Sequence, residues 1–462
     1  MKRLILPFLF VMSVFGVSAQ DLTAYFVEGS TFRSQLNPAF APLRGYVDIP
    51  LVGSIQVGVS GNTPFGALLF KNDGKLVAFT DKGISADAVL GRLGAVNDIS
   101  VGNRIGLVGF GKYARNRINF WSVDLGLNID AEANAPRELF AFLKGGEASD
   151  IRDARMSLQS YVDASFNYSF RLIPRLYIGV RAKVIVGMLG ADLALDRFDV
   201  SIGSDRWYAA VAGSIEMNGI SEELKTGDSI DFGQIGDYID VASIAKPSGY
   251  GGAIDIGATY DVANWLQLSA SVDNLGFVKW GNKSTRRFEF EQSVSSDDIS
   301  IVDGKVEFPE DIDLDNVKLT VVDGKASTQR LATRINVGAD FEFLDHRLGV
   351  GVLYNARIGA NKSYHTLMGS VNAHPLRWLG ITAAYSVIDN KAGAVSLALN
   401  LCPSWINFYI ATDVLLNKHI AYMIPDRGSK ANITFGLAVP IGLRGARRFT
   451  SQGIRRYLHY MY

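Results

Sequence analysis

The stretch TRINVGADFEF (333–343) decides the fold, because its side chains alternate in character along its whole length. Apolar side chains occupy every second position from Ile335 to Phe343, and polar residues or glycine occupy the positions between them, from Arg334 to Glu342. Side chains of a β-strand point alternately to its two faces, so this segment predicts a strand with one apolar and one polar face. The same alternation recurs at 162–170, 176–187, 254–261 and 433–441.

The predicted strands are long, and the connections between them alternate in length. Strands of roughly 10–15 residues exceed the five or six that are usual in soluble sheets and suit a tilted membrane crossing. Short turns on one rim and long loops on the other are typical of outer-membrane barrels. The short connections are 113–117, 172–175, 262–265, 344–347, 374–378 and 402–405, and the long or more polar ones include 61–98, 133–153, 191–247 and 283–327.

Counting strands on this basis gives about fourteen, an even number as a closed bacterial barrel requires. A soluble β-sandwich is the alternative for any single amphipathic strand, but strands of this length would leave exposed edges in an open sheet. Residues 191–218 resemble two further strands, and their charges predict a hairpin that projects beyond the outer rim. The sequence therefore predicts an all-β fold, a transmembrane antiparallel β-barrel with long extracellular loops, over residues 45–443.

The amino terminus predicts export. Lys2 and Arg3 precede an apolar run that ends in the small residues Val17-Ser18-Ala19, so residues 1–19 are expected to be a cleaved signal peptide. The single cysteine, Cys402, excludes an intramolecular disulfide framework. The 46 basic residues balance 46 acidic ones, which gives no general attraction to nucleic acid. No later stretch reaches about eighteen uninterrupted apolar residues, so an exported chain would be either soluble in the envelope or a barrel in the outer membrane. The long alternating strands favour the barrel, and the expected location is the bacterial outer membrane.

The sequence contains no pattern typical of catalysis. Its five histidines are not paired at metal-ligand spacing, and no Gly-x-Ser-x-Gly motif is present, so we predict no enzyme, no metal site and no cofactor. The charged residues on the polar faces of the strands are expected to line the lumen. Because their signs are mixed, they predict salt-bridged walls around a narrow path. These residues are Asp163, Arg181, Lys183, Asp255, Arg334, Asp340, Glu342 and Arg357.

Two motifs carry a resemblance to known barrels. QLNPAFAPLRGYVDIPLVGSI (35–55) and VDNLGFVKW (272–280) resemble a Bacteroidota family of uncharacterised outer-membrane β-barrels. That family is distantly similar to FadL-type hydrophobic-compound transporters and to barrels associated with secretion and gliding. The resemblance implies that residues 20–44 form a periplasmic or lumenal plug segment. Its candidate plug residues are Asn37, Pro38, Ala39 and Phe40.

The resemblance implies a FadL-like barrel that is surrounded by outer-membrane lipid and passes or binds a small hydrophobic molecule. An alternative remains open, because the basic-aromatic segment 444–462 follows the last predicted strand. In that alternative the protein transports nothing and acts as a scaffold. Its outer loops or its periplasmic tail would then hold a periplasmic or surface protein partner of a secretion or cell-surface complex.

Overall fold

The computed structural model describes most of the chain between residues 22 and 447. The predicted signal peptide (1–19) and the part of the predicted tail at 448–462 lie outside the described residues. The described ranges are 22–27, 29–72, 75–144, 151–202, 207–220, 224–231, 246–295, 300–302, 305–307, 318–322, 325–344, 346–376, 378–389, 391–414, 419–421, 424–425 and 431–447.

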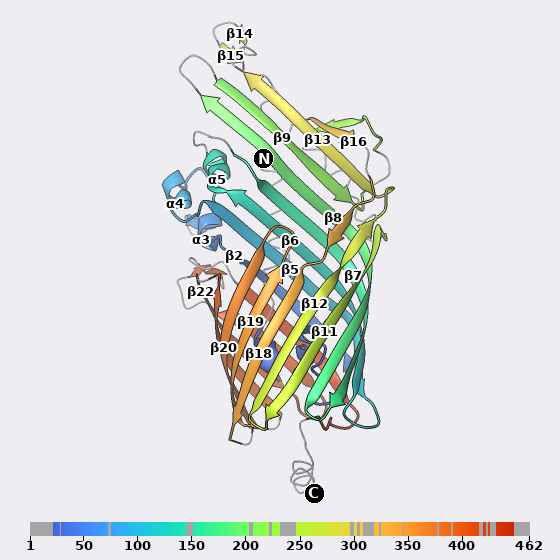
Figure 1. The fold of residues 1–462 in the computed structure, drawn as a ribbon. Helices are drawn as coiled ribbons and strands as arrows, with labels where there is room; N and C mark the ends of the chain where they lie inside the picture. Colours follow the sequence, from blue (N-terminus) through green and yellow to red (C-terminus); the bar gives the residue numbers. More distant parts are fainter. Residues whose placement is uncertain are drawn as a thin grey trace.

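Fourteen strands of the described chain close into one antiparallel barrel, which confirms the predicted fold class (Figure 1). The first strand is interrupted: β1 (Gly45–Asp48) and β2 (Ser54–Gly61) both pair with β5 on one side and with β26 on the other, which closes the ring. The remaining strands of the ring are β5 (Val96–Tyr113), β6 (Phe120–Pro136), β7 (Ala154–Ile173), β8 (Leu176–Ile202), β11 (Gly249–Ala263), β12 (Leu266–Trp280), β18 (Thr333–Phe343), β19 (Leu348–Ile358), β20 (Ser363–Leu376), β21 (Leu379–Ile388), β22 (Lys391–Leu401), β23 (Asn407–Val414) and β26 (Ala431–Ile441).

The interruption between β1 and β2 is a feature that the sequence did not predict at the start of the barrel. The amide of Gly53 donates a hydrogen bond of 2.6 Å to the carbonyl oxygen of Ile49, which closes a local turn. Leu51 has a φ of 65°, a backbone conformation that a strand does not contain. The alternation of side chains gives no sign of such a turn, because the turn depends on the backbone angles of a single residue.

The barrel wall has the reverse polarity of a soluble protein. In β18, the Val337 side chain is 50% exposed on the outside, whereas Asn336 next to it is fully buried on the inside. The same holds in β8 and β11, where Val184 and Ile256 face outward and Asp255 faces inward. Because water would favour the opposite arrangement, the outer surface of the wall is built for an apolar surrounding.

One rim carries the short turns, and tryptophans stand exposed there. Trp265, Trp378 and Trp405 lie in the turns that follow β11, β20 and β22, and their side chains are 53%, 45% and 71% exposed. Tryptophan is enriched where a membrane meets water, since its ring is apolar and its N–H needs a polar partner. We call this end the short-turn rim and the opposite end the long-loop rim.

Beyond the long-loop rim, β8 continues past the ring and pairs with β9 (Trp207–Asn218), and β9 pairs with β13 (Thr285–Ser295). The sheet is completed by β16 (Lys318–Val322) and β10 (Ser229–Asp231), and a cluster of buried apolar side chains covers it. The predicted hairpin at 191–218 lies in this sheet and adds no strand to the ring. Residues 203–206, between its two strands, fall outside the described residues.

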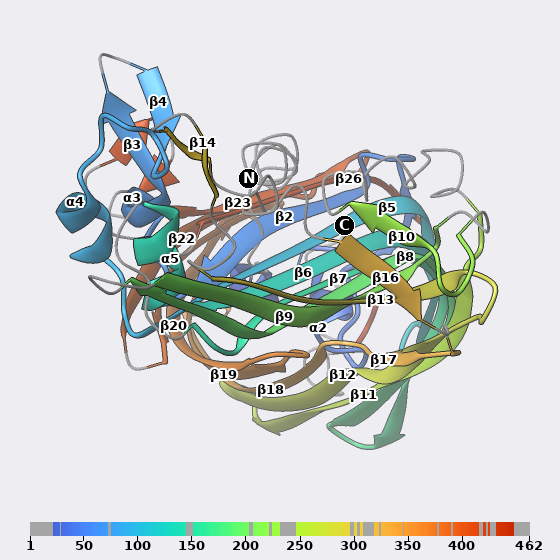
Figure 2. The same ribbon diagram turned by 90° about the horizontal axis from the view of Figure 1, so that it is seen from above.

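Smaller elements surround the long-loop rim. The helices α3 (Phe65–Leu68), α4 (Ala86–Leu90) and α5 (Arg137–Leu143) lie there, and the hairpin of β3 (Leu69–Asn72) and β4 (Lys75–Ala78) lies beside α3 and α4 (Figure 2). None of the helices in the described ranges is long and apolar enough to cross a membrane. The remaining short strands are β14 (Ser300–Val302), β15 (Lys305–Glu307), β17 (Thr328–Arg330), β24 (His419–Ala421) and β25 (Ile424–Pro425).

The amino-terminal part of the described chain enters the ring. The 3-10 helix η1 (Leu22–Phe26) and the short helix α2 (Arg33–Leu36) lie inside the barrel (Figure 2). We call residues 22–44 the N-terminal segment. Its apolar side chains form a buried cluster with lumen-facing residues of β19 to β23. The cluster includes Phe26, Phe32, Leu36 and Phe40 from the segment, and Leu353, Met368, Ala384, Ala398, Tyr409 and Ala411 from the wall.

Candidate functional site

Asn37 and Pro38 form the turn that ends α2. The amide of Phe40 donates a hydrogen bond of 3.0 Å to the carbonyl oxygen of Asn37, and the amide of Ala39 donates one of 2.9 Å to Asn37 Oδ1. Proline fixes the backbone for such a turn and disfavours helix at the residue before it, while an asparagine side chain caps the turn. These local interactions of the Asn-Pro-Ala-Phe sequence help to reverse the chain inside the lumen.

The Asn37 side chain also attaches this turn to the wall. Its Nδ2 donates to the carbonyl oxygens of Ala270 in β12 and Ala258 in β11, at 3.2 and 3.4 Å. The residue is fully buried, so each of these hydrogen bonds replaces one with water.

Lumen-facing side chains of other strands bind the backbone of the segment. The carbonyl oxygen of Leu36 accepts hydrogen bonds from Ser271 Oγ and Asn336 Nδ2, each of 2.9 Å. On the other side of α2, Gln35 Nε2 donates a hydrogen bond of 3.3 Å to Ser54 Oγ of β2. Further bonds come from Arg181 to the carbonyl oxygen of Ser34, from Ser169 to that of Ala39 and from Asn407 to that of Gly29. The segment is thus bound from opposite sides of the ring.

Glycines provide the space that the segment occupies. Gly179 in β8 and Gly257 in β11 are direct cross-strand partners. A Cβ atom at Gly179 would lie 2.0 Å from the carbonyl carbon of Pro38, and one at Gly257 would lie 2.0 Å from Asn37 Oδ1. No side chain fits at either position while the turn is seated. Gly338, Gly351 and Gly436 make the same close approach to Tyr25, Phe26 and Phe32.

Aromatic side chains join the two halves of the segment. The Tyr25 ring packs edge-to-face on Phe26 and Phe40, with centroids 5.2 and 5.0 Å apart. The Arg33 guanidinium lies 3.9 Å from the Phe40 ring centroid and donates a hydrogen bond of 2.8 Å to the Tyr25 carbonyl oxygen. Burial raises the pKa of Tyr25 to about 12, so its hydroxyl keeps its proton and donates to Ser269 Oγ at 2.9 Å.

The start of the predicted tail contacts the segment from the short-turn rim. Arg447 donates hydrogen bonds of 2.7 Å to the carbonyl oxygen of Ala39 and of 2.9 Å to that of Ser169. Its guanidinium lies 5.1 Å from the ring centroid of Tyr177, whose hydroxyl donates to the Arg447 carbonyl oxygen. The amide of Gly445 donates 2.9 Å to the carbonyl oxygen of Leu43. Residues 444–447 therefore tie the end of the barrel to the N-terminal segment.

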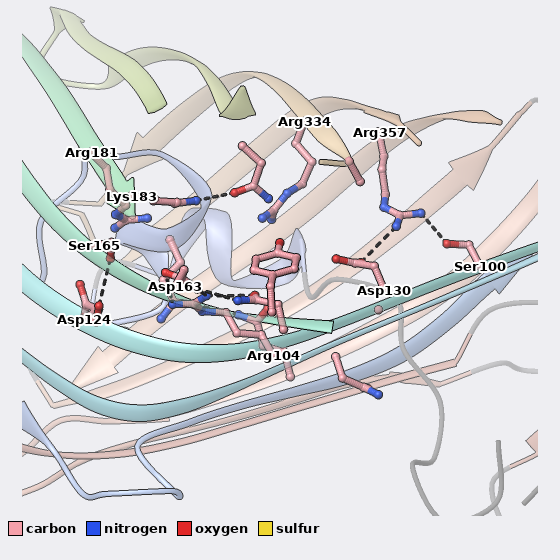
Figure 3. Close-up of a pocket in the computed structure, with 18 of the residues that line it drawn as sticks. Ser100, Arg104, Asp124, Asp130, Asp163, Ser165, Arg181, Lys183, Arg334 and Arg357 are labelled. Atoms are coloured by element: carbon pink, nitrogen blue, oxygen red, sulfur yellow. Dashed lines mark hydrogen bonds and ion pairs between the residues drawn. The ribbon is translucent and has the colours of Figure 1, made fainter. Parts of the chain in front are cut away.

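On the long-loop side of α2, the wall encloses a polar cavity (Figure 3). Gln35 of α2 lines it together with residues of β2, β5, β6, β7, β8, β12, β18 and β19. The charged residues of the lining are Arg104, Asp124, Asp130, Asp163, Arg181, Lys183, Arg334 and Arg357.

Ion pairs organise most of these charges. Arg104 contacts Asp163, whose Oδ1 also accepts a hydrogen bond of 2.6 Å from Asn128. Lys183 Nζ lies 2.8 Å from Asp255 Oδ2, and Arg181 lies 3.5 Å from the same oxygen. A further set joins Arg357 to Glu132 and Asp130 at 3.1 and 3.3 Å. Such pairs, which are largely shielded from water, fix the positions of the wall side chains.

The structure brings together most, but not all, of the eight predicted lumen residues. Asp163, Arg181, Lys183, Arg334 and Arg357 line the cavity, and Asp255 binds two of them. Asp340 is buried in the barrel but is not part of the cavity lining. Glu342 lies at the short-turn rim, where it contacts His346. The four candidate plug residues, Asn37 to Phe40, are all buried in the lumen.

Sequence reasoning missed several residues of the cavity. Arg104 and Asp130 share the polar face of their strands with residues that alternate correctly, so the same period-two pattern could have identified them. Tyr161 gave no such signal, because an aromatic residue next to a membrane wall is more often outward-facing. The role of Gln35 depends on the placement of α2 in the ring.

Comparison with solved structures finds barrels of similar overall extent and low similarity in detail. The toluene transporter TbuX of Ralstonia pickettii matches with a TM-score of 0.42 and 8% identity over 90% of this chain and 95% of that chain. The toluene transporter TodX of Pseudomonas putida matches with a TM-score of 0.39 and 10% identity over 89% of this chain and 92% of that chain. A Pseudomonas aeruginosa FadL homologue matches with a TM-score of 0.38 and 10% identity over 92% of this chain and 95% of that chain.

No curated protein shows significant sequence similarity to the chain. The family model described as "Family of unknown function (DUF5723)" matches residues 38–413. The match begins at Pro38 in the turn of the N-terminal segment and ends in β23, before the last strand of the ring. The chain therefore belongs to this family.

Proposed function

We propose that the protein is an outer-membrane β-barrel that its N-terminal segment closes at rest, and that displacement of this segment lets a small hydrophobic molecule pass or bind. One observation carries the proposal: residues 29–40 lie across the lumen, bound by wall side chains from opposite sides and seated against glycines. A segment that only led into the first strand would not need an interior fitted to it.

The membrane location rests on the wall itself. Val337, Val184 and Ile256 are exposed on the outer surface, whereas Asn336 and Asp255, their neighbours on the inner face, are polar and buried. Exposed tryptophans at the short-turn rim mark one membrane–water boundary. This distribution supports a barrel in lipid and supports the outer membrane as its location.

The hydrophobic ligand is supported by what the segment covers. Phe26 and Phe32 pack on a wall whose side chains from β19 to β23 are small or apolar, such as Met368 and Ala384. Displacing the segment would expose this apolar strip inside the lumen, where a small hydrophobic molecule could replace the aromatic rings.

The scaffold alternative would need a tail that is available to a partner. The described part of the tail is engaged within the chain, since Arg447 binds Ala39 and Ser169. Affinity purification with the chain ended after residue 447 separates the two functions. A protein partner that is lost on this truncation would favour the scaffold.

Liposome swelling tests the proposal. Vesicles that contain the full-length protein should swell slowly in an isosmotic pentose solution, because the segment closes the lumen. Vesicles with a variant that lacks residues 22–40 should swell several-fold faster. Heat-modifiable gel migration of both proteins shows that each barrel is folded. Equal swelling rates of two folded proteins would refute closure by the segment.

A further inference from the structure

Arg334 differs from the other four cationic side chains that line the cavity. Each of the others contacts a carboxylate: Arg104 contacts Asp163, Arg181 and Lys183 contact Asp255, and Arg357 contacts Asp130 and Glu132. Arg334 forms no hydrogen bond or ion pair with any residue in the described ranges. Its side chain points into the cavity (Figure 3).

The carboxylate across the strand pair forms no ion pair with Arg334, although its Oδ1 has no hydrogen-bond partner among the described residues. Asp273 in β12 is the direct cross-strand partner of Arg334 in β18. Its Oδ2 accepts hydrogen bonds of 2.9 Å from both Ser271 and Asn336, and Asp273 is not part of the cavity lining. The guanidinium therefore keeps its planar set of N–H donors directed at the open space.

A second donor faces the same space. Tyr161 in β7 lines the cavity with its side chain 4% exposed, and its hydroxyl has no hydrogen-bond partner within the part of the chain that the structure describes. Two donors with no acceptor from the wall, one of them cationic, are therefore available to an acceptor in the cavity. An oxyanion satisfies both, because its oxygens accept several hydrogen bonds and its charge offsets that of the guanidinium.

We propose that the cavity binds a small water-soluble oxyanion, a carboxylate or a phosphate, through Arg334 and the Tyr161 hydroxyl. Lys183 favours this binding, since it shares the single carboxylate of Asp255 with Arg181. The other aspartates of the lining are bound to donors: Asp163 and Asp130 to arginines, and Asp124 to Tyr46 and Ser122. The site rests on the proposed function, because Gln35 of the seated segment is part of its lining. It is separate from the apolar strip that the segment covers.

Calorimetric titration of the detergent-purified full-length protein tests the site. Succinate and inorganic phosphate are added at constant ionic strength, and succinamide serves as the uncharged counterpart of succinate. We expect saturable binding of at least one anion and none of succinamide. Arg334→Gln should weaken this binding about tenfold or more, because it removes a charge-assisted pair of hydrogen bonds. Tyr161→Phe should weaken it roughly threefold to tenfold, the effect of one neutral donor.

Two further variants keep the result interpretable. Arg347→Gln removes an exposed arginine of the short-turn rim and should leave the affinity unchanged. Arg334→Lys keeps the positive charge but removes the planar pair of N–H donors, so it should give an intermediate affinity. This variant is informative even if Arg334→Gln does not fold. The inference is overturned if neither anion binds the wild-type protein, or if the Arg334 and Tyr161 variants bind as the wild type does.

Failure of this site can be distinguished from failure of the proposed function. The titration measures binding to the closed barrel and involves no transport. If the protein binds succinate but vesicles swell equally with and without residues 22–40, the anion site is supported and closure by the segment is refuted. If the protein binds neither anion but deletion of residues 22–40 accelerates swelling, closure by the segment is supported and the anion site is refuted.

Discussion

Gly179 of β8 and Gly257 of β11 face each other across neighbouring strands, and together they form the niche that holds the Asn37-Pro38 turn. Neither position has room for a Cβ atom, since both would meet the turn at 2.0 Å. The wall and the segment are therefore fitted to each other at the narrowest point of their contact.

Gly257→Val should unseat the segment without unfolding the barrel. Overpacking costs about 1–3 kcal/mol, which shifts the ratio of open to closed barrel by roughly fivefold to a hundredfold. Faster liposome swelling is the expected result. Gly369→Val is the matched control, because a Cβ atom there meets nothing within 4 Å on the exposed face of β20. Equal swelling of both variants would contradict the assigned role of the glycine pair.

Asn37→Ala should loosen the turn while leaving the lumen wall unchanged. The substitution removes the cap on the Ala39 amide and the donors to the carbonyl oxygens of Ala270 and Ala258. Loss of buried hydrogen bonds of this kind costs about 1–3 kcal/mol. Hydrogen exchange followed by mass spectrometry should show faster exchange in peptides that contain residues 37–43, with no change in β19 or β20. Unchanged exchange in the turn would show that the asparagine does not hold it.

The contacts of Arg447 predict that two truncations, four residues apart, behave differently. Ending the chain after residue 443 removes the hydrogen bonds from Arg447 to Ala39 and Ser169, so closure should weaken and swelling should accelerate. Ending it after residue 447 keeps these bonds and should leave swelling at the full-length rate. If both truncations swell alike, the short-turn rim plays no part in holding the segment.

The reversed polarity of the wall makes the cost of a surface charge depend on its height. Val337→Arg places a charge near the middle of the outward face of β18 and should destabilise the barrel in lipid vesicles by about 2–4 kcal/mol. Leu344→Arg, in the short turn after β18, should cost about 0–1 kcal/mol. Urea unfolding in vesicles measures both. Equal costs would show that this surface does not face lipid.

The architecture could be predicted from the sequence because a barrel wall separates two solvents at every strand. That separation imposes the period of two seen from Ile335 to Phe343, and it forces short and long connections to alternate. The turn at Leu51 escaped prediction, because a local backbone angle leaves no mark on side-chain alternation.

The site was less accessible to prediction. Alternation identifies which charged residues face inward, but not which of them meet across the lumen. The contact of Arg357 with Glu132 and the bond from Arg181 to the Ser34 carbonyl oxygen depend on ring closure and on the seated segment. The Asn-Pro turn was recognised through resemblance. The glycines that receive it became recognisable only when its position was known.

Single-channel conductance in planar bilayers tests the central claim most directly. The full-length protein should show a small or undetectable conductance, and the variant without residues 22–40 should show large, stable openings, because removing the segment leaves a water-filled lumen. The small conductance of the full-length protein should depend on both partners of the contact, the segment and the glycines Gly179 and Gly257 that receive it. Identical conductance of the two folded proteins would contradict a barrel that its N-terminal segment closes.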